Sequence, residues 1–431
     1  MSALPSISPA LRYLYGLQRR GMKLGLRNMR YLLCSVGNPE QAFPSIHIAG
    51  TNGKGSTAAF LASIFMEASY KTALYTSPHL IRFTERIRIN GTEMDEGRLV
   101  RYVRTLQPAV ENVHATFFEA TTCIAFMYFA DENVDVAVVE TGLGGRLDST
   151  NVIKPLVSVI TNVSYDHTEE LGSTLVAIAR EKGGIIKRRT PCVTSVHNDG
   201  ALRVLSRTAA QRGSFLYHTD ELVGLRSAAR AGGSYRATFR TPHAVARNVT
   251  LGFPGCHQIA NASTAVATIE VILRNNLLSR LNAKCIGTGL RNVRKNSRLH
   301  GRFETFGTHG RYLLDVAHNP DGVAKLVASL GREQKEQWVV VFGLMKDKDF
   351  RGMLDRLAPV TAEMITVRPG IPRALSTRVL CREARLRGIP ATDGGSVGRG
   401  IALACRRSGM RILVTGSHYV VGEAMTYLGV S

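Results

Sequence analysis

The chain has 431 residues, of which 44% are hydrophobic and 20% are charged. This balance is typical of a globular protein of two or three domains, and it excludes a disordered or fibrous chain. Its 55 lysines and arginines exceed its 33 acidic residues and give a net charge of +22, which attracts polyanions such as nucleic acid, nucleotides or poly-acid substrates without specifying a fold.

Short apolar runs alternate with helical patterns between about residues 45 and 200. The predicted strands are Ser45–Ala49, Thr72–Thr76, Val134–Val139 and Leu156–Ile160. Helices are predicted at Ser56–Ser69 and Thr174–Lys187. Nearly continuous apolar strands belong in a parallel sheet that is covered on both faces. The first part of the chain therefore predicts an α/β domain with a parallel-rich central sheet.

The strongest local motif follows the first strand and opens the first helix. Its glycines allow backbone N–H groups to surround phosphate oxygens, the start of the helix favours the anion, and Lys54 adds a positive charge. Gly55 follows the lysine, whereas the standard form of this loop has a hydroxyl residue there. The expected phosphate contacts are Gly50, Thr51, Asn52, Gly53, Lys54, Gly55 and Ser56.

Polar residues also follow two other predicted strands. Glu140 comes directly after Val134–Val139, and Asp166 and His167 follow Leu156–Ile160. Ligands collect at the carboxyl ends of strands in open α/β sheets, so we expect these side chains at the edge that carries the phosphate loop. A nucleotide needs Mg²⁺, which prefers oxygen ligands, and Glu140 is the expected carboxylate. The alternatives are a surface glutamate that starts a loop and a structural histidine.

The middle of the chain is less regular. Residues 200–250 are polar and rich in arginine, and they predict short strands and loops. Ile259–Asn276 predicts one long helix. Thr288–His300 is basic and has few apolar residues, so we expect it to be the hinge between two domains.

A second α/β series begins near Gly301. Its predicted strands are Tyr312–Val316, Gln337–Phe342, Glu363–Val367 and Met410–Thr415. Its predicted helices are Asp321–Leu330, Phe350–Leu357, Thr377–Arg387, Val397–Arg407 and Val420–Tyr427. These elements are enough for a smaller α/β domain. We place the two domains at residues 1–297 and 298–431.

Six motifs, in the same order, resemble those of the folylpolyglutamate synthase/dihydrofolate synthase family of the Mur ligase superfamily. They are Gly50–Ser56, Thr76–Leu80 with Phe83–Ile87, Glu140–Asp148 with Thr150-Asn151, Asp166-His167, Glu181–Ile185 and Asp315–Pro320. The resemblance implies an N-terminal P-loop ATPase domain and a C-terminal Rossmann-like glutamate ligase domain with the active site between them. It also implies that a pterin carboxylate attacks the γ-phosphate of ATP, and that the amine of L-glutamate then displaces phosphate from the acyl phosphate.

The resemblance assigns roles to individual residues. The implied catalytic residues are Lys54, Glu140, His167, Lys182 and His318, and the implied metal ligands are Ser77, Glu140, His167 and, if it is carbamylated, Lys182. The implied nucleotide contacts outside the phosphate loop are Asn261, Arg302 and Asp315. The implied contacts of the pterin substrate are Thr116, Phe117, Phe118, Glu119, Leu147, Asp148 and Ser149. From the residues alone, Ser77 could equally be a turn hydroxyl, Lys182 a solvated helix lysine, and either phenylalanine a core residue.

The loop Gly142–Asp148 resembles that of bifunctional bacterial members, so we expect both dihydropteroate and reduced folates as acceptors, with ATP and Mg²⁺. We expect a monomer without nucleic-acid or membrane partners. One alternative is a nucleic-acid-associated P-loop ATPase, suggested by the basic stretch Arg280–Arg311, although 7% aromatic residues offer little for base stacking. Another is a Mur-type ligase of cell-wall precursors, against which Thr76–Leu80 and Phe83–Ile87 argue.

The seven cysteines are scattered and show no C-x-x-C spacing, which predicts neither a disulfide framework nor a zinc site. Met1–Gly25 lacks a secretory leader pattern, and no run of about 18 apolar residues occurs. We therefore expect a cytoplasmic protein.

Overall fold

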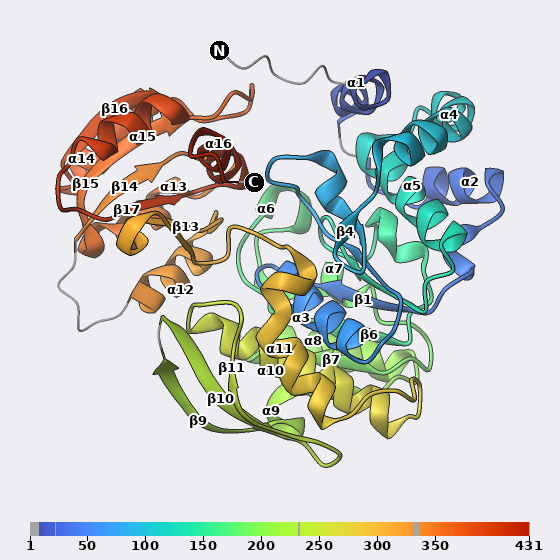
Figure 1. The fold of residues 1–431 in the computed structure, drawn as a ribbon. Coiled ribbons are helices and arrows are strands. Elements are labelled where there is room, and N and C mark those ends of the chain that lie inside the picture. The colour runs from blue at the N-terminus through green and yellow to red at the C-terminus, as the bar shows by residue number, and fades with distance from the viewer. Residues whose placement is uncertain (1–7, 22, 232, 331–336, 431) are drawn as a thin grey trace.

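The computed structural model describes residues 8–21, 23–231, 233–330 and 337–430. Within them the first sheet has eight strands in the order β4-β3-β2-β5-β1-β6-β7-β8. Figure 1 shows this part of the molecule on the right, beside the C-terminal elements on the left. The strands are β1 (Ser45–Ala49), β2 (Thr72–Tyr75), β3 (Ile87–Ile89), β4 (Thr92–Glu93), β5 (Val136–Glu140), β6 (Val157–Ile160), β7 (Cys192–Thr194) and β8 (Leu216–His218). The strands β2, β5, β1, β6, β7 and β8, taken in their order across the sheet, pair in parallel with their neighbours. The pairs β2–β3 and β3–β4 at the other edge are antiparallel. This confirms the predicted parallel-rich sheet.

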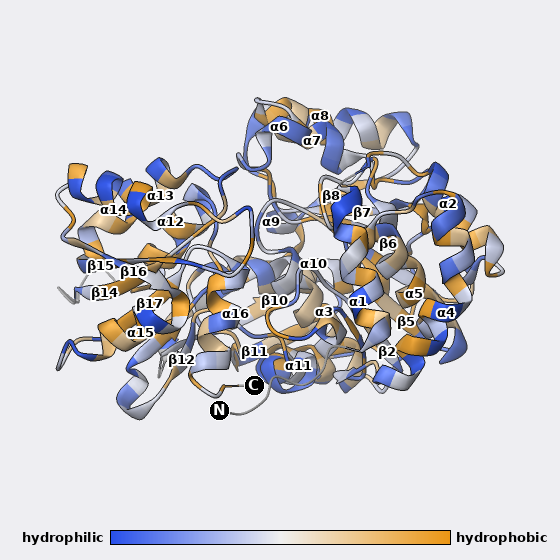
Figure 2. Ribbon diagram, turned by 90° about the horizontal axis from the view of Figure 1, so that it is seen from above, coloured by the Kyte–Doolittle hydropathy of each residue, from blue (hydrophilic) through white to orange (hydrophobic). Residues whose placement is uncertain are grey.

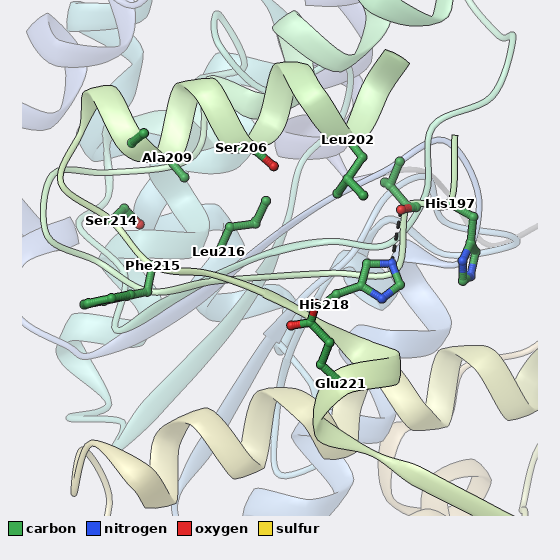
Figure 3. A pocket seen from close by; sticks show the side chains of 11 residues that line it. His197, Leu202, Ser206, Ala209, Ser214, Phe215, Leu216, His218 and Glu221 are labelled. Atoms are coloured by element: carbon green, nitrogen blue, oxygen red, sulfur yellow. Dashed lines mark hydrogen bonds between the residues drawn. The ribbon is translucent and has the colours of Figure 1, made fainter. Parts of the chain in front are cut away.

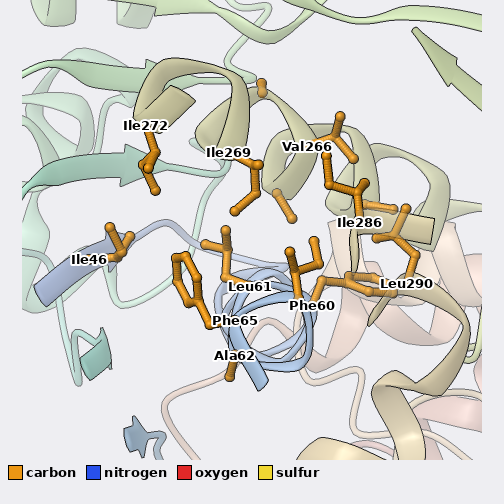
Figure 4. Packing of buried hydrophobic residues seen from close by; sticks show 14 of the residues in the cluster. Ile46, Phe60, Leu61, Ala62, Phe65, Val266, Ile269, Ile272, Ile286 and Leu290 are labelled. Carbon is orange, nitrogen blue, oxygen red and sulfur yellow. The ribbon is translucent and has the colours of Figure 1, made fainter. Parts of the chain in front are cut away.

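Helices cover both faces of this sheet. One face packs on α3 (Lys54–Glu67) and α10 (His257–Arg274), which lies against β6 and β7, and α11 (Ala283–Ser297) covers the outer side of α3. Figure 4 shows α3 between Ile46 of the sheet and the side chains of Ile269 and Leu290, which come from α10 and α11. The other face packs on α1 (Pro9–Gly16), α2 (Arg27–Ser35), α4 (Glu96–Asn112) and α5 (Phe117–Asp131). Because α3 is enclosed, the phosphate loop at its start is held by a rigid element.

A small antiparallel sheet adjoins α10 and α11. Its strands are β9 (Gly224–Ala231), β10 (Ser234–Arg240) and β11 (Val245–Thr250). Ala237 and Phe239 are buried on its inner face, whereas Arg236 and Arg240 alternate with them and are exposed. The alternation explains why this arginine-rich segment is still a sheet.

The C-terminal sheet has the order β12-β13-β17-β14-β15-β16 and is parallel except for β12. Its strands are β12 (Glu304–Phe306), β13 (Tyr312–Leu314), β14 (Trp338–Phe342), β15 (Thr361–Arg368), β16 (Ala391–Ser396) and β17 (Ile412–Thr415). One face is covered by α12 (Pro320–Leu330), α13 (Phe350–Leu357) and α14 (Thr377–Leu386), and the other by α15 (Val397–Cys405) and α16 (His418–Tyr427). Figure 2 shows this α/β layer beside the larger one. In the described residues, no helix is long and apolar enough to cross a membrane.

Two sequence expectations are wrong. Residues 200–250 do not consist only of short strands and loops, because α8 (Asp199–Gln211) opens this region and buries Ala201, Leu205 and Ala209 at a spacing of four. Nor is Thr288–His300 a hinge over most of its length, because it continues α11 to Ser297. Leu290 and Val293 are buried there beside basic residues that face solvent. The segment between α11 and β12 is therefore only residues 298–303.

Candidate active site

The phosphate loop joins β1 to α3, and its shape depends on close approaches at glycine. Gly53 has a φ of 84°, and a Cβ there would lie 2.4 Å from Asn261 Oδ1 of α10. The backbone N–H groups of Thr51 and Asn52 both donate to Asn162 Oδ1, at 3.1 and 2.7 Å. Asn162, which lies after β6, thus holds the loop, although it was absent from the predicted site residues. Its position in the segment that carries Asp166 was the available signal.

Glu140 lies buried at the end of β5, beside the loop. Its Oε2 accepts the backbone N–H of Ser77 at 3.2 Å, and its Oε1 lies 4.0 Å from Lys54 Nζ. Burial raises the pKa of Glu140, while the charges of Lys54 and Arg302 act in the opposite direction. A Cβ on Gly55 would lie 3.4 Å from Glu140 Oε2 and 3.2 Å from Arg302 Nη2. The carboxylate of one domain and the guanidinium of the other therefore meet over the phosphate loop.

Asp166 is the centre of a second cluster between the domains. Lys348 Nζ donates to Asp166 Oδ1 at 2.6 Å and lies 2.9 Å from His167 Nε2. Asn319 Nδ2 donates to Asp166 Oδ2 at 3.0 Å, and His318 Nε2 lies 3.4 Å from the same oxygen. Burial alone would raise the pKa of Asp166, but His318 and Lys348 lower it. Burial and then the charge of Lys348 lower the pKa of His167 to about 4.

Lys348 and Asn319 were absent from the predicted site residues. The Lys348 side chain is only 8% exposed, and it follows β14 in the run Lys346-Asp347-Lys348-Asp349. A charged run at the carboxyl end of a buried parallel strand was a usable signal. Asn319 also bonds to the phosphate loop, since Asn52 Nδ2 donates to Asn319 Oδ1 at 3.1 Å. The C-terminal domain thus contacts both the loop and the Asp166 cluster.

Asp315 lies just after β13, and its carboxylate accepts two backbone hydrogen bonds in this structure. Its Oδ2 accepts the N–H of Phe303 and its Oδ1 accepts that of Ala317, both at 2.9 Å. Burial raises its pKa, and the charge of Arg302 lowers it. Through Phe303, the carboxylate fixes the residue next to Arg302 and so orients the guanidinium toward the loop.

Lys182 of α7 (Leu175–Gly183) is 2% exposed. The alternative of a solvated helix lysine is therefore wrong. Within the described part of the chain its ammonium makes no hydrogen bond, and burial, followed by the charge of Lys54, lowers its pKa to about 7. An amine with such a pKa is partly neutral at physiological pH, which is the form that reacts with carbon dioxide.

The predicted metal ligands are only partly gathered. Ser77 and Glu140 are joined by the hydrogen bond described above. Among the residues that the structure describes, neither His167 nor Lys182 bonds to either of them. The buried carboxylate and the Ser77 hydroxyl are hard oxygen donors beside the phosphate loop, and this donor set fits Mg²⁺.

The predicted pterin contacts divide into structural and accessible side chains. Thr116 and Glu119 form the capping box of α5: Thr116 N–H donates to Glu119 Oε2 at 2.7 Å, and Glu119 N–H donates to Thr116 Oγ1 at 3.3 Å. Phe117 stacks on Tyr15 with ring centroids 6.0 Å apart, and Arg86 lies 5.3 Å from its centroid.

The ring of Phe118 packs closely on the loop after β5 at Gly142, where an added Cβ would lie only 2.5 Å from the ring. Asp148 accepts the N–H groups of Leu143 and Thr150, at 2.8 and 3.0 Å, and so shapes the same loop. Ser149 is buried, whereas Leu147 is half-buried. The structure therefore leaves the two phenylalanines and Leu147 as the candidates for direct contact.

Comparisons with known proteins agree with this geometry. The Mur ligase middle domain matches residues 48–269, and the Mur ligase glutamate ligase domain matches residues 301–418. The dihydrofolate synthase/folylpolyglutamate synthase of Bacillus subtilis is 35% identical over 374 residues, which cover 85% of this chain and 86% of the relative. The Escherichia coli protein of the same name is 30% identical, with 96% and 94% covered.

Solved structures extend the likeness to the whole fold. Folylpolyglutamate synthase of Mycobacterium tuberculosis complexed with ADP has a TM-score of 0.88 at 30% identity and covers 97% of this chain, which in turn covers 98% of it. E. coli FolC in complex with DHPP and ADP has a TM-score of 0.86 at 28% identity, with 99% of both chains covered. The phosphate loop with Glu140 beside it, the Asp166 cluster and these similarities together place this chain in the dihydrofolate synthase/folylpolyglutamate synthase family of the Mur ligase superfamily.

Proposed function

We propose that the protein is an ATP-dependent ligase that joins L-glutamate to the carboxylate of dihydropteroate and to the glutamate tail of reduced folates. One observation carries this proposal: the phosphate loop, Glu140 and Arg302 meet where the two domains touch, next to the Asp166–Lys348 cluster. Relatives with the same architecture were solved with ADP. A site built from two domains can hold a nucleotide on one and an amino acid on the other.

The chemistry begins with two anions that repel each other. The acceptor carboxylate attacks the γ-phosphorus of ATP, ADP leaves, and an acyl phosphate forms. Lys54, the N–H groups at the start of α3 and Arg302 supply positive charge where negative charge accumulates. The amine of glutamate then attacks the acyl carbon and phosphate leaves with one oxygen of the original carboxylate. Asp166, His167, Lys348 and His318 lie where they can bind and orient the incoming amino acid.

Ser77 and Glu140 are the residues that would hold Mg²⁺, with His167 and Lys182 as the further candidates. The ion would neutralise charge on the phosphate oxygens of the nucleotide. Lys182, as a carbamate, would present an anionic oxygen to this region in place of an ammonium that Lys54 repels. Its burial and its lowered pKa support the modification.

The loop Gly142–Asp148 supports two acceptors on one site, and the names of two similar proteins carry both activities. We further propose a monomer in the cytoplasm, in keeping with seven free cysteines. The test is a product assay with ATP, L-glutamate and either dihydropteroate or tetrahydrofolate. Glutamylated product from both acceptors is expected. Product from only one would refute the double activity, and product from neither, with ATP hydrolysis stimulated by DNA or RNA, would refute the ligase.

A further inference from the structure

A second group of side chains that can bind a metal lies away from the phosphate loop, at the edge strand β8. His218 ends β8, Asp220 lies in the short helix α9 (Thr219–Leu222), and His197 lies in the loop after β7. One ligand atom from each lies within 4.8 Å of the others. Figure 3 shows the two imidazoles next to each other at one end of a hollow between α8 and β8.

Two hydrogen bonds fix the protonation of the His218 ring. Its Nε2 lies 3.1 Å from the carbonyl oxygen of Val196, which can only accept, so Nε2 carries the proton. Its Nδ1 accepts the backbone N–H of Asp220 at 3.4 Å, so Nδ1 carries the lone pair. That bond is long, and a metal at Nδ1 would replace it. A histidine that donates one ring N–H to a backbone carbonyl and offers the lone pair of its other nitrogen is the usual arrangement of metal ligands.

The Asp220 carboxylate faces both imidazoles. Its Oδ2 lies 3.8 Å from His197 Nδ1 and 3.9 Å from His218 Nδ1. Although the chain has 55 lysines and arginines, none in the described ranges forms an ion pair with this carboxylate. These separations, and the upper limit of 4.8 Å for the three ligand atoms together, exceed the ~3.4 Å between two ligand atoms that are bound tetrahedrally at about 2.0–2.1 Å. Rotation of the exposed His197 and Asp220 side chains, 71% and 67% exposed, can close this difference.

We propose that His197, His218 and Asp220 form a site for a late first-row divalent cation such as Zn²⁺, separate from the site beside the phosphate loop. Two imidazole nitrogens and one carboxylate oxygen suit Zn²⁺, whereas Mg²⁺ prefers oxygen alone. The exposed side leaves the remaining coordination positions to water or to an anionic ligand in the adjacent hollow of ≈ 550 Å³, which Leu202 and Phe215 help to line. The bound ion links the loop after β7 to α9.

The test is calorimetric titration of the full chain with Zn²⁺ alone. The variants are His197→Ala/His218→Ala and, as a matched control, His114→Ala/His309→Ala, which removes two exposed histidines elsewhere. Zinc bound at the ligase site contributes equally to all three proteins, so the wild type and the control should bind one more Zn²⁺ than the site variant. Melting curves in EDTA show that each protein is folded.

A second variant examines the carboxylate. Asp220→Asn keeps the size of the side chain and should raise the zinc Kd at least about tenfold, since loss of even an outer-shell partner of a metal has that effect. Zn²⁺ should also raise the melting temperature of the wild type more than that of the site variant. Equal zinc stoichiometry in the three proteins, or an unchanged Kd in Asp220→Asn, would overturn the proposal.

Discussion

Lys54 and Glu140 carry opposite charges 4.0 Å apart beside the phosphate loop, and each should matter to activity more than to folding. Lys54→Ala removes a positive charge aimed at the phosphates, and Glu140→Gln keeps an acceptor for the Ser77 N–H while removing the carboxylate. Each should lower kcat by about 10²–10³, the usual loss for one electrostatic contact to a transition state. Steady-state kinetics and melting curves measure the two effects. Near-normal kcat in either variant would refute the role of that residue.

Lys182 should make stability depend on pH. The pKa of its ammonium is about 7 in the folded chain and 10.5 ordinarily, so between these values the unfolded chain holds a proton that the folded chain has released. Stability therefore rises with pH across this window, and the full cost of burying the charge is present below it. Lys182→Met removes the cost, so its melting temperature should exceed that of the wild type most at about pH 6 and least above about pH 10.

Those melts require buffer free of carbon dioxide, so that the lysine is not carbamylated. Lys284→Met provides the control, because Lys284 is exposed. The same variant of Lys182 should lose ligase activity. A difference in melting temperature between Lys182→Met and wild type that does not change with pH would contradict the buried ammonium.

Among the elements, α11 was the hardest to recognise as a helix from the sequence. Its Arg291, Arg294 and Lys295 suggested a basic linker, yet Ile286, Leu290 and Val293 recur at helical spacing and cover α3. Gly289 allows the close approach, because a Cβ there would lie 2.6 Å from Ile64 Cα. Gly289→Ala should therefore destabilise the fold by about 1–3 kcal/mol through overpacking against backbone.

Gly287 of the same helix supplies the matched comparison. A Cβ there would meet Val249 Cγ2 at an ordinary 3.6 Å, so Gly287→Ala should be neutral or stabilise by up to about 1 kcal/mol because alanine favours helix. Urea unfolding of the two variants measures both values. Equal stabilities would show that α11 does not pack on α3 as described.

The buried strands were predictable because they are long apolar runs between turn residues. β1, β5, β6, β14 and β15 were all recognised to within two residues. β16 was not, because its sequence Ala-Thr-Asp-Gly-Gly-Ser has low strand propensity and its place depends on pairing with β15. The phosphate loop and Glu140 were predictable for the same reason: they directly follow recognisable strands.

Contacts between distant segments could not be predicted from local patterns. Lys348 and Asn319 belong to the C-terminal domain, and their meeting with Asp166 depends on how the two domains pack. Thr116 and Glu119 lie where family motifs place substrate contacts, yet their side chains are engaged in capping α5. The sequence therefore identified the polar groups at the strand ends, whereas the packing of the two domains determines which of these groups come into contact.

For the whole molecule, the net charge of +22 remains larger than the site requires. Arg236 and Arg240 on the outer face of the small sheet contribute to it and lie outside every motif. If the excess charge steers anionic substrates, kcat/KM for the folate acceptor should fall severalfold between low salt and about 0.5 M, since salt screens interactions beyond a Debye length. A kcat/KM that is independent of salt would show that the charge has another purpose.

The central claim is that a substrate carboxylate is activated by ATP before glutamate attacks. The most direct measurement uses dihydropteroate labelled with ¹⁸O in its carboxylate, together with MgATP and L-glutamate, and determines the isotope content of the released phosphate by mass spectrometry. The proposed route predicts one ¹⁸O atom in each phosphate, in amounts equal to the glutamylated product. Product formed with unlabelled phosphate would contradict the acyl phosphate and, with it, the assigned chemistry of the site.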